Sequence, residues 1–128
     1  MAQYPNLNDL NVDDDMKVAL GKMQDKMIDD YNRFMPLTGS DSKCKVRTDM
    51  RKRYANGFAY SKGQKYLKVI SIDNQTSVLH FINLGNPNFK VGDILKSAGW
   101  STPALNKARG NIFDDHYPIN WTGAVYLT

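Results

Sequence analysis

The sequence predicts an α+β fold, in which a long N-terminal helix packs on an antiparallel sheet of about four strands, with two short helices before the last strand. Three observations predict it: helical spacing of apolar residues near the N-terminus, an alternation of period two in the middle, and a return to helical spacing after it. The 128 residues suffice for one domain. We therefore assign residues 1–128 to a single domain, with 1–12 as a flexible arm because they are polar and rich in Asn.

The first helix is expected over residues 13–35. Three consecutive aspartates from Asp13 place negative charge where a helix N-terminus favours it, and Pro36 ends the helix. Between them, apolar residues recur at spacings of three and four and form one stripe. The stripe predicts packing on the protein's own sheet; the alternative is a surface for a partner or a second copy, since methionine adapts to irregular surfaces. The candidate partner-binding residues are Met16, Leu20, Met23 and Met27.

The densest basic cluster follows a turn-rich link at 37–42. Six cations occur in the eleven residues from 43 to 53, with Asp49 as the one acidic residue among them. Such a run forms either a solvated face or a surface for an anion, because the cations repel one another unless negative charge comes near. Over residues 43–110 there are thirteen Lys and Arg against three Asp. The basic charge therefore belongs to the middle of the chain.

The next segment alternates with a period of two and is rich in β-branched and aromatic residues. We expect strands over 58–60, 65–72 and 76–84. The turns between them are short, which predicts an antiparallel meander. His80 lies within the third of these stretches, and its alternation with apolar neighbours predicts a histidine on a face of the sheet.

Helical spacing returns at 92–98 and at 103–109, and a last strand is expected over 117–127. The two short helices, joined by a tight turn at Gly99, have the outline of a helix-turn-helix, although ordinary packing is the default interpretation. The second of them would expose residue types that contact bases and phosphates, namely Asn106, Lys107 and Arg109. For Arg109 a structural ion pair with Asp93 or Asp114 is the other interpretation.

The absence of glutamate excludes several enzyme classes, since all thirteen acidic residues are aspartate. The H-E-x-x-H pattern of zinc proteases, the H-x-E pattern of deaminases and the EF-hand loop all need a glutamate. Phosphate- and dinucleotide-binding glycine motifs are absent too, so we expect neither enzymatic activity nor a cofactor. A metal-dependent nuclease that uses Asp93, Asp114 and His116 is the minor enzymatic alternative.

Cysteine content and hydropathy bear on the location of the protein. Cys44 is the single cysteine, so neither an internal disulfide nor a multi-cysteine zinc site can form. The first residues lack the pattern of a signal peptide, and no run of apolar residues is long enough to span a bilayer. These features predict a cytoplasmic protein without a membrane partner.

One segment carries a resemblance to known proteins. Residues 92–113 read GDILKSAGWSTPALNKARGNIF, and Trp121-Thr122-Gly123-Ala124 follows. This segment resembles part of small proteins of unassigned function that are encoded by tailed bacteriophages. Those proteins are also similar in having an N-terminal helix followed by strands of the type Tyr66-Leu67-Lys68-Val69. The similarity covers roughly the C-terminal half; it implies a phage origin and a location in the host cytoplasm, and no mechanism.

Together these observations favour a non-enzymatic protein that binds DNA or RNA through the basic segments 43–53 and 107–109. Cations would neutralise phosphates, and Tyr54, Tyr60 or Trp100 would stack on a base. The alternative is a protein that binds a host enzyme or defence system, or a homodimer formed through the methionine-rich helix. The candidate nucleic-acid-binding residues are Lys45, Arg47, Arg51, Lys52, Arg53, Tyr54, Trp100, Asn106, Lys107 and Arg109.

Overall fold

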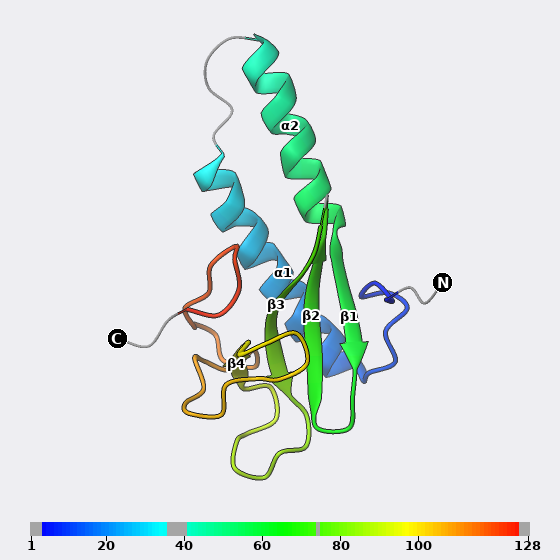
Figure 1. Cartoon of the computed structure of the whole chain (residues 1–128), viewed down its shortest axis with the longest axis vertical. Coiled ribbons are helices and arrows are strands. Elements are labelled where there is room, and N and C mark those ends of the chain that lie inside the picture. The colour runs from blue at the N-terminus through cyan, green and yellow to red at the C-terminus, as the bar shows by residue number, and fades with distance from the viewer. Residues whose placement is uncertain (1–3, 36–40, 74, 126–128) are drawn as a thin grey trace.

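The computed structural model describes residues 4–35, 41–73 and 75–125. A helical hairpin precedes a four-stranded antiparallel sheet of order β1-β2-β3-β4 (Figure 1). The predicted α+β class with a long N-terminal helix is confirmed. The elements are α1 (Asp14–Phe34), α2 (Asp41–Asn56), β1 (Phe58–Lys62), β2 (Tyr66–Ile72), β3 (Thr76–Asn83) and β4 (Ile94–Lys96).

Helix α1 begins where the aspartate run predicts. The Asp13 side chain accepts a hydrogen bond of 2.8 Å from the Met16 backbone N–H, which satisfies one of the free donors of the first turn. Phe34 is the last helical residue, and Pro36, predicted to end the helix, lies outside the described residues.

The apolar stripe of α1 packs against the sheet as predicted, so the alternative of a partner surface on it is wrong. Its four candidate residues are each at most 5% exposed and belong to the main core. Apolar burial is the dominant favourable term in folding, and the sheet already supplies a cover for this stripe. The four corrected residues are Met16, Leu20, Met23 and Met27.

The meander forms as the alternation predicts, because one set of alternating side chains in β1, β2 and β3 faces α1. The register shifts between Val69 and Ile70, where Leu79 is the extra residue on β3. His80 faces α1 and is fully buried, with its Nε2 atom 3.2 Å from the Met23 sulfur. The core residues that the strands contribute are Phe58, Tyr60, Leu67, Val69, Leu79, Ile82 and Ile94.

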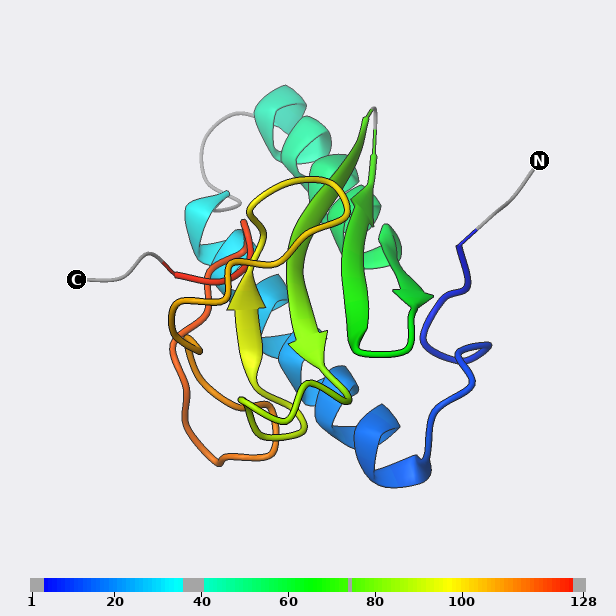
Figure 2. The ribbon, with the colours of Figure 1, turned by 60° about the horizontal axis from the view of Figure 1, so that its bottom comes forward.

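The opposite face of the sheet is covered by the segment after β4, which crosses over it in Figure 2. Trp100 in this segment lies under the ammonium group of Lys68 from β2, whose Nζ atom is 4.5 Å from the ring centroid. Ile70, Phe81 and Leu95 are buried on this second face. Both faces of β3 and β4 are therefore covered, which explains why Ile94 and its neighbour Leu95 are both fully buried.

Residues 4–12 of the predicted flexible arm pack on the domain. Leu10 is 3% exposed and belongs to the core, and the Pro5 carbonyl accepts a hydrogen bond from the Tyr60 N–H of β1. The Lys62 ammonium group donates to the Asn11 carbonyl at 2.7 Å. The segment is thus part of the fold in spite of its polar composition, while residues 1–3 lie outside the described residues.

The two short helices predicted before the last strand are wrong. Residues 92–98 form a turn followed by β4, and 103–109 form an irregular segment along the outer edge of β4. Adjacent apolar residues such as Ile94 and Leu95 fit a buried helix and a strand covered on both faces equally well. A helix-turn-helix is therefore absent from residues 92–109.

The last strand predicted over 117–127 is also wrong for its described part. Asn120 and Gly123 exchange backbone hydrogen bonds of 3.0 and 2.9 Å and close a tight turn, and the fourth place in the sheet belongs to β4. Residues 126 and 127 of that prediction lie outside the described residues. None of the helices in the described ranges has the length and apolarity that crossing a bilayer requires.

Candidate nucleic-acid interface

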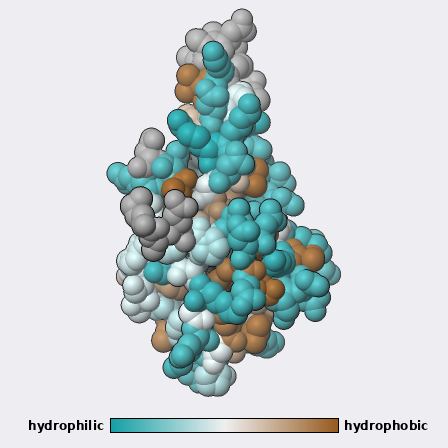
Figure 3. Space-filling view, turned by 90° about the vertical axis from the view of Figure 1, so that its right-hand side faces the viewer, coloured by the Kyte–Doolittle hydropathy of each residue, from teal (hydrophilic) through white to brown (hydrophobic). Residues whose placement is uncertain are grey.

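Helix α2, whose residues the sequence marks as a basic cluster but not as a helix, projects beyond the sheet and beyond the end of α1 (Figure 1). It carries six Lys and Arg against two Asp. Hydrophilic side chains dominate the projecting end in the space-filling view of Figure 3. Lys45 and Lys52 are exposed. They are seven residues apart, which places them on the same face of the helix two turns from each other.

Arg51 turns inward and caps the end of α1. Its guanidinium donates hydrogen bonds of 3.0 Å from Nε to the Met35 carbonyl and 2.8 Å from an Nη atom to the Asn32 carbonyl. The last carbonyls of a helix lack partners inside the helix, and a cation near them also complements the helix dipole. This candidate phosphate ligand is therefore occupied in holding the two helices together.

The remaining cations of α2 differ in their surroundings. Arg53 pairs with Asp73, with 3.3 Å between Nε and Oδ1, and both side chains are about half exposed. A pair this exposed is screened by water and contributes little to stability. Arg47 is half-buried. Of the predicted cations in this helix, Lys45 and Lys52 are thus the two exposed ones outside the Arg53–Asp73 pair.

Tyr54 and Tyr60, two of the predicted base-stacking residues, belong to the core, so that prediction is wrong for them. Tyr54 is 6% exposed, stacks on Tyr31 with 4.3 Å between ring centroids, and donates a 2.6 Å hydrogen bond to the Trp121 carbonyl. Tyr60 is fully buried, and its hydroxyl donates to the Gln24 side-chain oxygen. Burial raises the pKa of both phenols above the usual 10.

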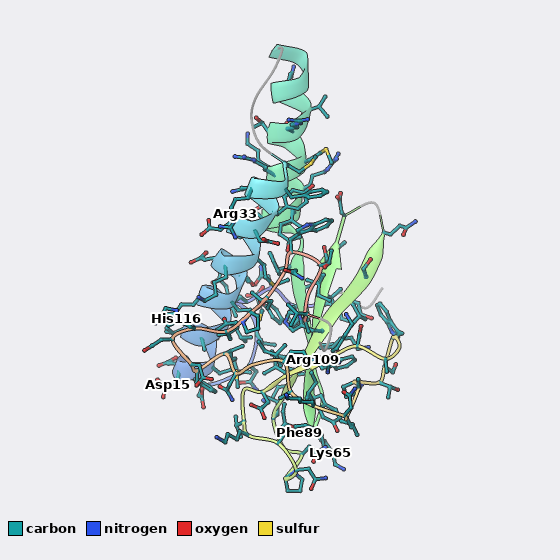
Figure 4. All side chains as sticks on the ribbon, turned by 90° about the vertical axis from the view of Figure 1, so that its left-hand side faces the viewer. Asp15, Arg33, Lys65, Phe89, Arg109 and His116 are labelled. Atoms are coloured by element: carbon teal, nitrogen blue, oxygen red, sulfur yellow. The ribbon has the colours of Figure 1, made fainter. Side chains whose placement is uncertain are left out.

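The predicted second basic group, 107–109, lies beside the sheet, away from α2 (Figures 1 and 4). Asn106 and Lys107 are exposed, but Arg109 is 8% exposed and donates to the Asn106 side chain and the Lys107 carbonyl at 3.2 and 2.7 Å. Within the described ranges, no carboxylate pairs with it. The structure therefore does not bring 43–53 and 107–109 onto one surface, and Arg109 organises its own loop.

Trp100, the third predicted stacking residue, is 45% exposed. One edge meets Tyr4, with ring centroids 6.4 Å apart, and the Lys68 ammonium group lies over its face. The ring is thus occupied by a cation from the same chain, on the sheet face opposite α1.

The three residues of the nuclease alternative do not form a metal-binding group. Asp93 uses both carboxylate oxygens within its loop, accepting from the Asn111 amide at 2.9 Å and from the Lys90 N–H at 2.9 Å. His116 lies on the loop beside the N-terminal half of α1, near Asp15 in Figure 4. In the part of the chain that the structure describes, no three His, Cys, Asp or Glu side chains gather as metal ligands.

A cavity that the sequence analysis missed lies at the base of α2. Its volume is about 490 Å³, and Tyr31, Tyr54 and Trp121 supply an aromatic wall. The side chains come from α1, α2, the β2–β3 end of the sheet and the C-terminal segment, so no local pattern could have indicated it. The other lining residues are Ser71, Asp73, Gln75, Ser77, Val78, Leu79 and Thr122.

Comparison with known proteins adds one finding. The model of a protein family matches residues 2–126. The chain belongs to the family of unknown function DUF7717. The expected membership of a family of unassigned function is thereby confirmed, and the DUF7717 match extends over α2 and the aromatic cavity as well as the C-terminal half. No curated protein and no solved structure matches this DUF7717 chain.

Proposed function

We propose that this protein binds nucleic acid without catalysing a reaction, and that the exposed face of α2 supplies the phosphate contacts. One observation carries the proposal: a basic helix projects from the domain and presents Lys45 and Lys52 on one face. A helix that is polar over most of its surface is stabilised little by packing against its own domain. Because α2 also projects from the domain, its polar surface is accessible for binding a partner. Phosphate groups are the partner that its charge favours.

The structure narrows the set of phosphate-contacting residues that the sequence suggests. Arg51 holds the end of α1, and the charge of Arg53 is partly balanced by Asp73, so we take Lys45 and Lys52 as the principal contacts and Arg53 as a weaker one. Each phosphate that a lysine neutralises releases condensed counterions, so affinity falls as salt rises. A small number of contacts predicts modest affinity and a shallow salt dependence.

The place of action follows from the resemblance of residues 92–113 to proteins of tailed bacteriophages. It supports a phage origin, and hence the host cytoplasm as the compartment in which DNA or RNA would be met.

The test compares two double variants with the same change in net charge. Lys45→Glu/Lys52→Glu reverses the exposed face of α2, whereas Lys65→Glu/Lys90→Glu reverses two exposed lysines outside it, of which Lys65 lies at the opposite end of the molecule (Figure 4). Fluorescence anisotropy with labelled single- and double-stranded oligonucleotides, over a series of salt concentrations, measures the affinity of each protein.

We expect the α2 variant to lose at least tenfold in affinity and its salt slope to fall by about one to two, since each phosphate contact contributes about 0.7 to 0.9 to the slope. The control should lose much less. Equal losses in both variants would show that net charge alone attracts the oligonucleotide. No binding by the wild-type protein at low salt would refute the proposal, and a search for a protein partner would follow.

A further inference from the structure

We propose that the aromatic cavity at the base of α2 takes an unstacked base of a single-stranded nucleic acid whose phosphates lie along α2. This inference rests on the proposed function and adds the substrate class to it. The cavity and the helix are continuous, because Arg53 and Tyr54 belong to the last turn of α2 and Tyr54 forms part of the cavity wall.

The wall offers an apolar surface of the kind on which bases stack. Tyr31 and Tyr54 lie parallel, with 4.3 Å between ring centroids and 10° between ring planes. Trp121 meets the Tyr31 ring edge-on, with 5.1 Å between centroids and 74° between planes. Both tyrosines are nearly buried, whereas Trp121 is partly exposed. Phe34 lies against the Trp121 ring, with 5.1 Å between centroids and 36° between planes, so the available platform is the part of the ring that Phe34 leaves uncovered.

Hydrogen bonds hold this wall in place. The Tyr54 hydroxyl donates to the Trp121 carbonyl at 2.6 Å, and the Trp121 backbone N–H donates to an Asp30 carboxylate oxygen at 2.9 Å. The segment that carries Trp121 is thus tied to both helices although it has no regular secondary structure. A wall fixed before binding requires little ordering when a ligand enters, which favours affinity.

The rim of the cavity is polar and matches the edge of a base. Asp73, Gln75 and Ser77 are exposed at the β2–β3 end of the sheet, and Thr122 is exposed on the C-terminal segment. The Asp73 carboxylate, which also pairs with Arg53 through Oδ1, can accept hydrogen bonds such as those of an exocyclic amino group, while amide and hydroxyl groups can donate as well as accept. The volume of about 490 Å³ lies in the range of small-ligand pockets.

The position of Lys52 explains why the strand should be single. Lys52 lies two positions before Tyr54, the residue of α2 that lines the cavity, and Lys45 lies about 10 Å farther along the helix axis. Two positions turn the helix by about 200°, so a strand that follows these two lysines must pass around the last turn of α2 to bring a nucleotide to the cavity mouth. A base can enter only when it is unpaired and unstacked, which costs far less in a single strand than in a duplex.

The test fills the cavity from the sheet side. Ser77→Leu places a bulky side chain at a lining position that is itself exposed, and Thr76→Leu makes the same change at the neighbouring exposed position of β3, which does not line the cavity. Anisotropy with a twelve-nucleotide single strand and with a duplex of the same sequence is measured for both variants, the wild type and Lys45→Glu/Lys52→Glu. Circular dichroism and thermal unfolding check that each variant folds.

We expect the wild type to bind the single strand about tenfold more tightly than the duplex, and Ser77→Leu to lose that preference through the loss of one stacked base, while Thr76→Leu retains it. If Ser77→Leu binds both oligonucleotides as the wild type does, while the α2 variant loses binding, the cavity inference is wrong and the α2 proposal stands. If the α2 variant binds normally, or no oligonucleotide binds at all, both are wrong.

Discussion

A substitution at Arg51 tests whether this residue of the basic cluster caps helix α1 or contacts phosphate. In Arg51→Met the aliphatic stem remains, but the two hydrogen bonds to the Asn32 and Met35 carbonyls are lost. Hydrogen bonds from a charged donor each contribute about 1.5 to 3 kcal/mol, and water replaces part of that at a half-buried site. We therefore expect the free energy of unfolding to fall by about 2 kcal/mol, which lowers the Tm of a chain of this length by about 7 °C.

Urea unfolding followed by circular dichroism measures this change, and Lys52→Met serves as the matched control. Lys52 is exposed on the same helix, and a substitution there should change stability by less than about 0.5 kcal/mol. For the affinity for nucleic acid we expect the opposite ranking of the two variants: Lys52→Met should weaken binding more than Arg51→Met does. An Arg51→Met protein that unfolds at the wild-type urea concentration but no longer binds nucleic acid would refute the assignment of Arg51 as a helix cap.

Two further predictions concern the core. Burial, together with the positive charge of Lys96, lowers the pKa of His80 from 6.5 to about 3. The unfolded chain therefore takes up a proton below pH 6.5 that the folded chain does not. The free energy of unfolding has its full value above pH 7 and falls by about 2 kcal/mol by pH 5. Urea unfolding at both pH values should show this fall in the wild type but not in His80→Leu, and equal falls would contradict it. At Gly123, φ is +112° and an added Cβ would lie 2.2 Å from the Leu79 carbonyl oxygen, so Gly123→Ala should cost several kcal/mol, on the order of the largest single-substitution effects. Gly99→Ala, where nothing lies within 4 Å of the added atom, is its control in thermal unfolding, and similar Tm values for the two would rule out the clash.

The elements that the sequence predicts well are those whose burial follows a single period. The stripe of α1 and the alternation in β1 to β3 each have one buried face, and both were recognisable. Helix α2 shows no such face over residues 45–56, whose side chains the structure describes. Tyr54 is the one residue of that range in the main core, and the helical state depends on intrinsic propensity and on packing against α1. The sequence of β4 predicts a helix instead of a strand, because a strand covered on both faces does not alternate between apolar and polar residues.

The candidate site was predictable as a segment but not as a set of side chains. The density of positive charge indicates residues 43–53 as the site. Within it, however, the neighbouring residues Arg51 and Lys52 differ: Arg51 donates hydrogen bonds to the end of α1, whereas Lys52 is exposed to solvent. The direction of a side chain depends on the rotation of α2 against α1, which residues distant in sequence determine. The aromatic cavity depends on still longer-range contacts, such as that between Tyr54 and Trp121.

The two outer strands of the sheet bear on how copies of this protein can associate. The N–H of Tyr60 on β1 is taken by the Pro5 carbonyl, and β4 exchanges hydrogen bonds with the irregular segment at 103–111, including those of Ile94 with Arg109 and Gly110. A strand with free N–H and C=O groups is a template for another chain, and unprotected edges lead to fibrillar aggregates. Here the β4 edge is paired within the molecule and one N–H of the β1 edge is taken, in both cases by segments too irregular to offer the same hydrogen-bond pattern to another chain. Continuous sheets through neighbouring molecules are thereby disfavoured, and the projecting helix can stay exposed at high concentration without recruiting a β-fibril.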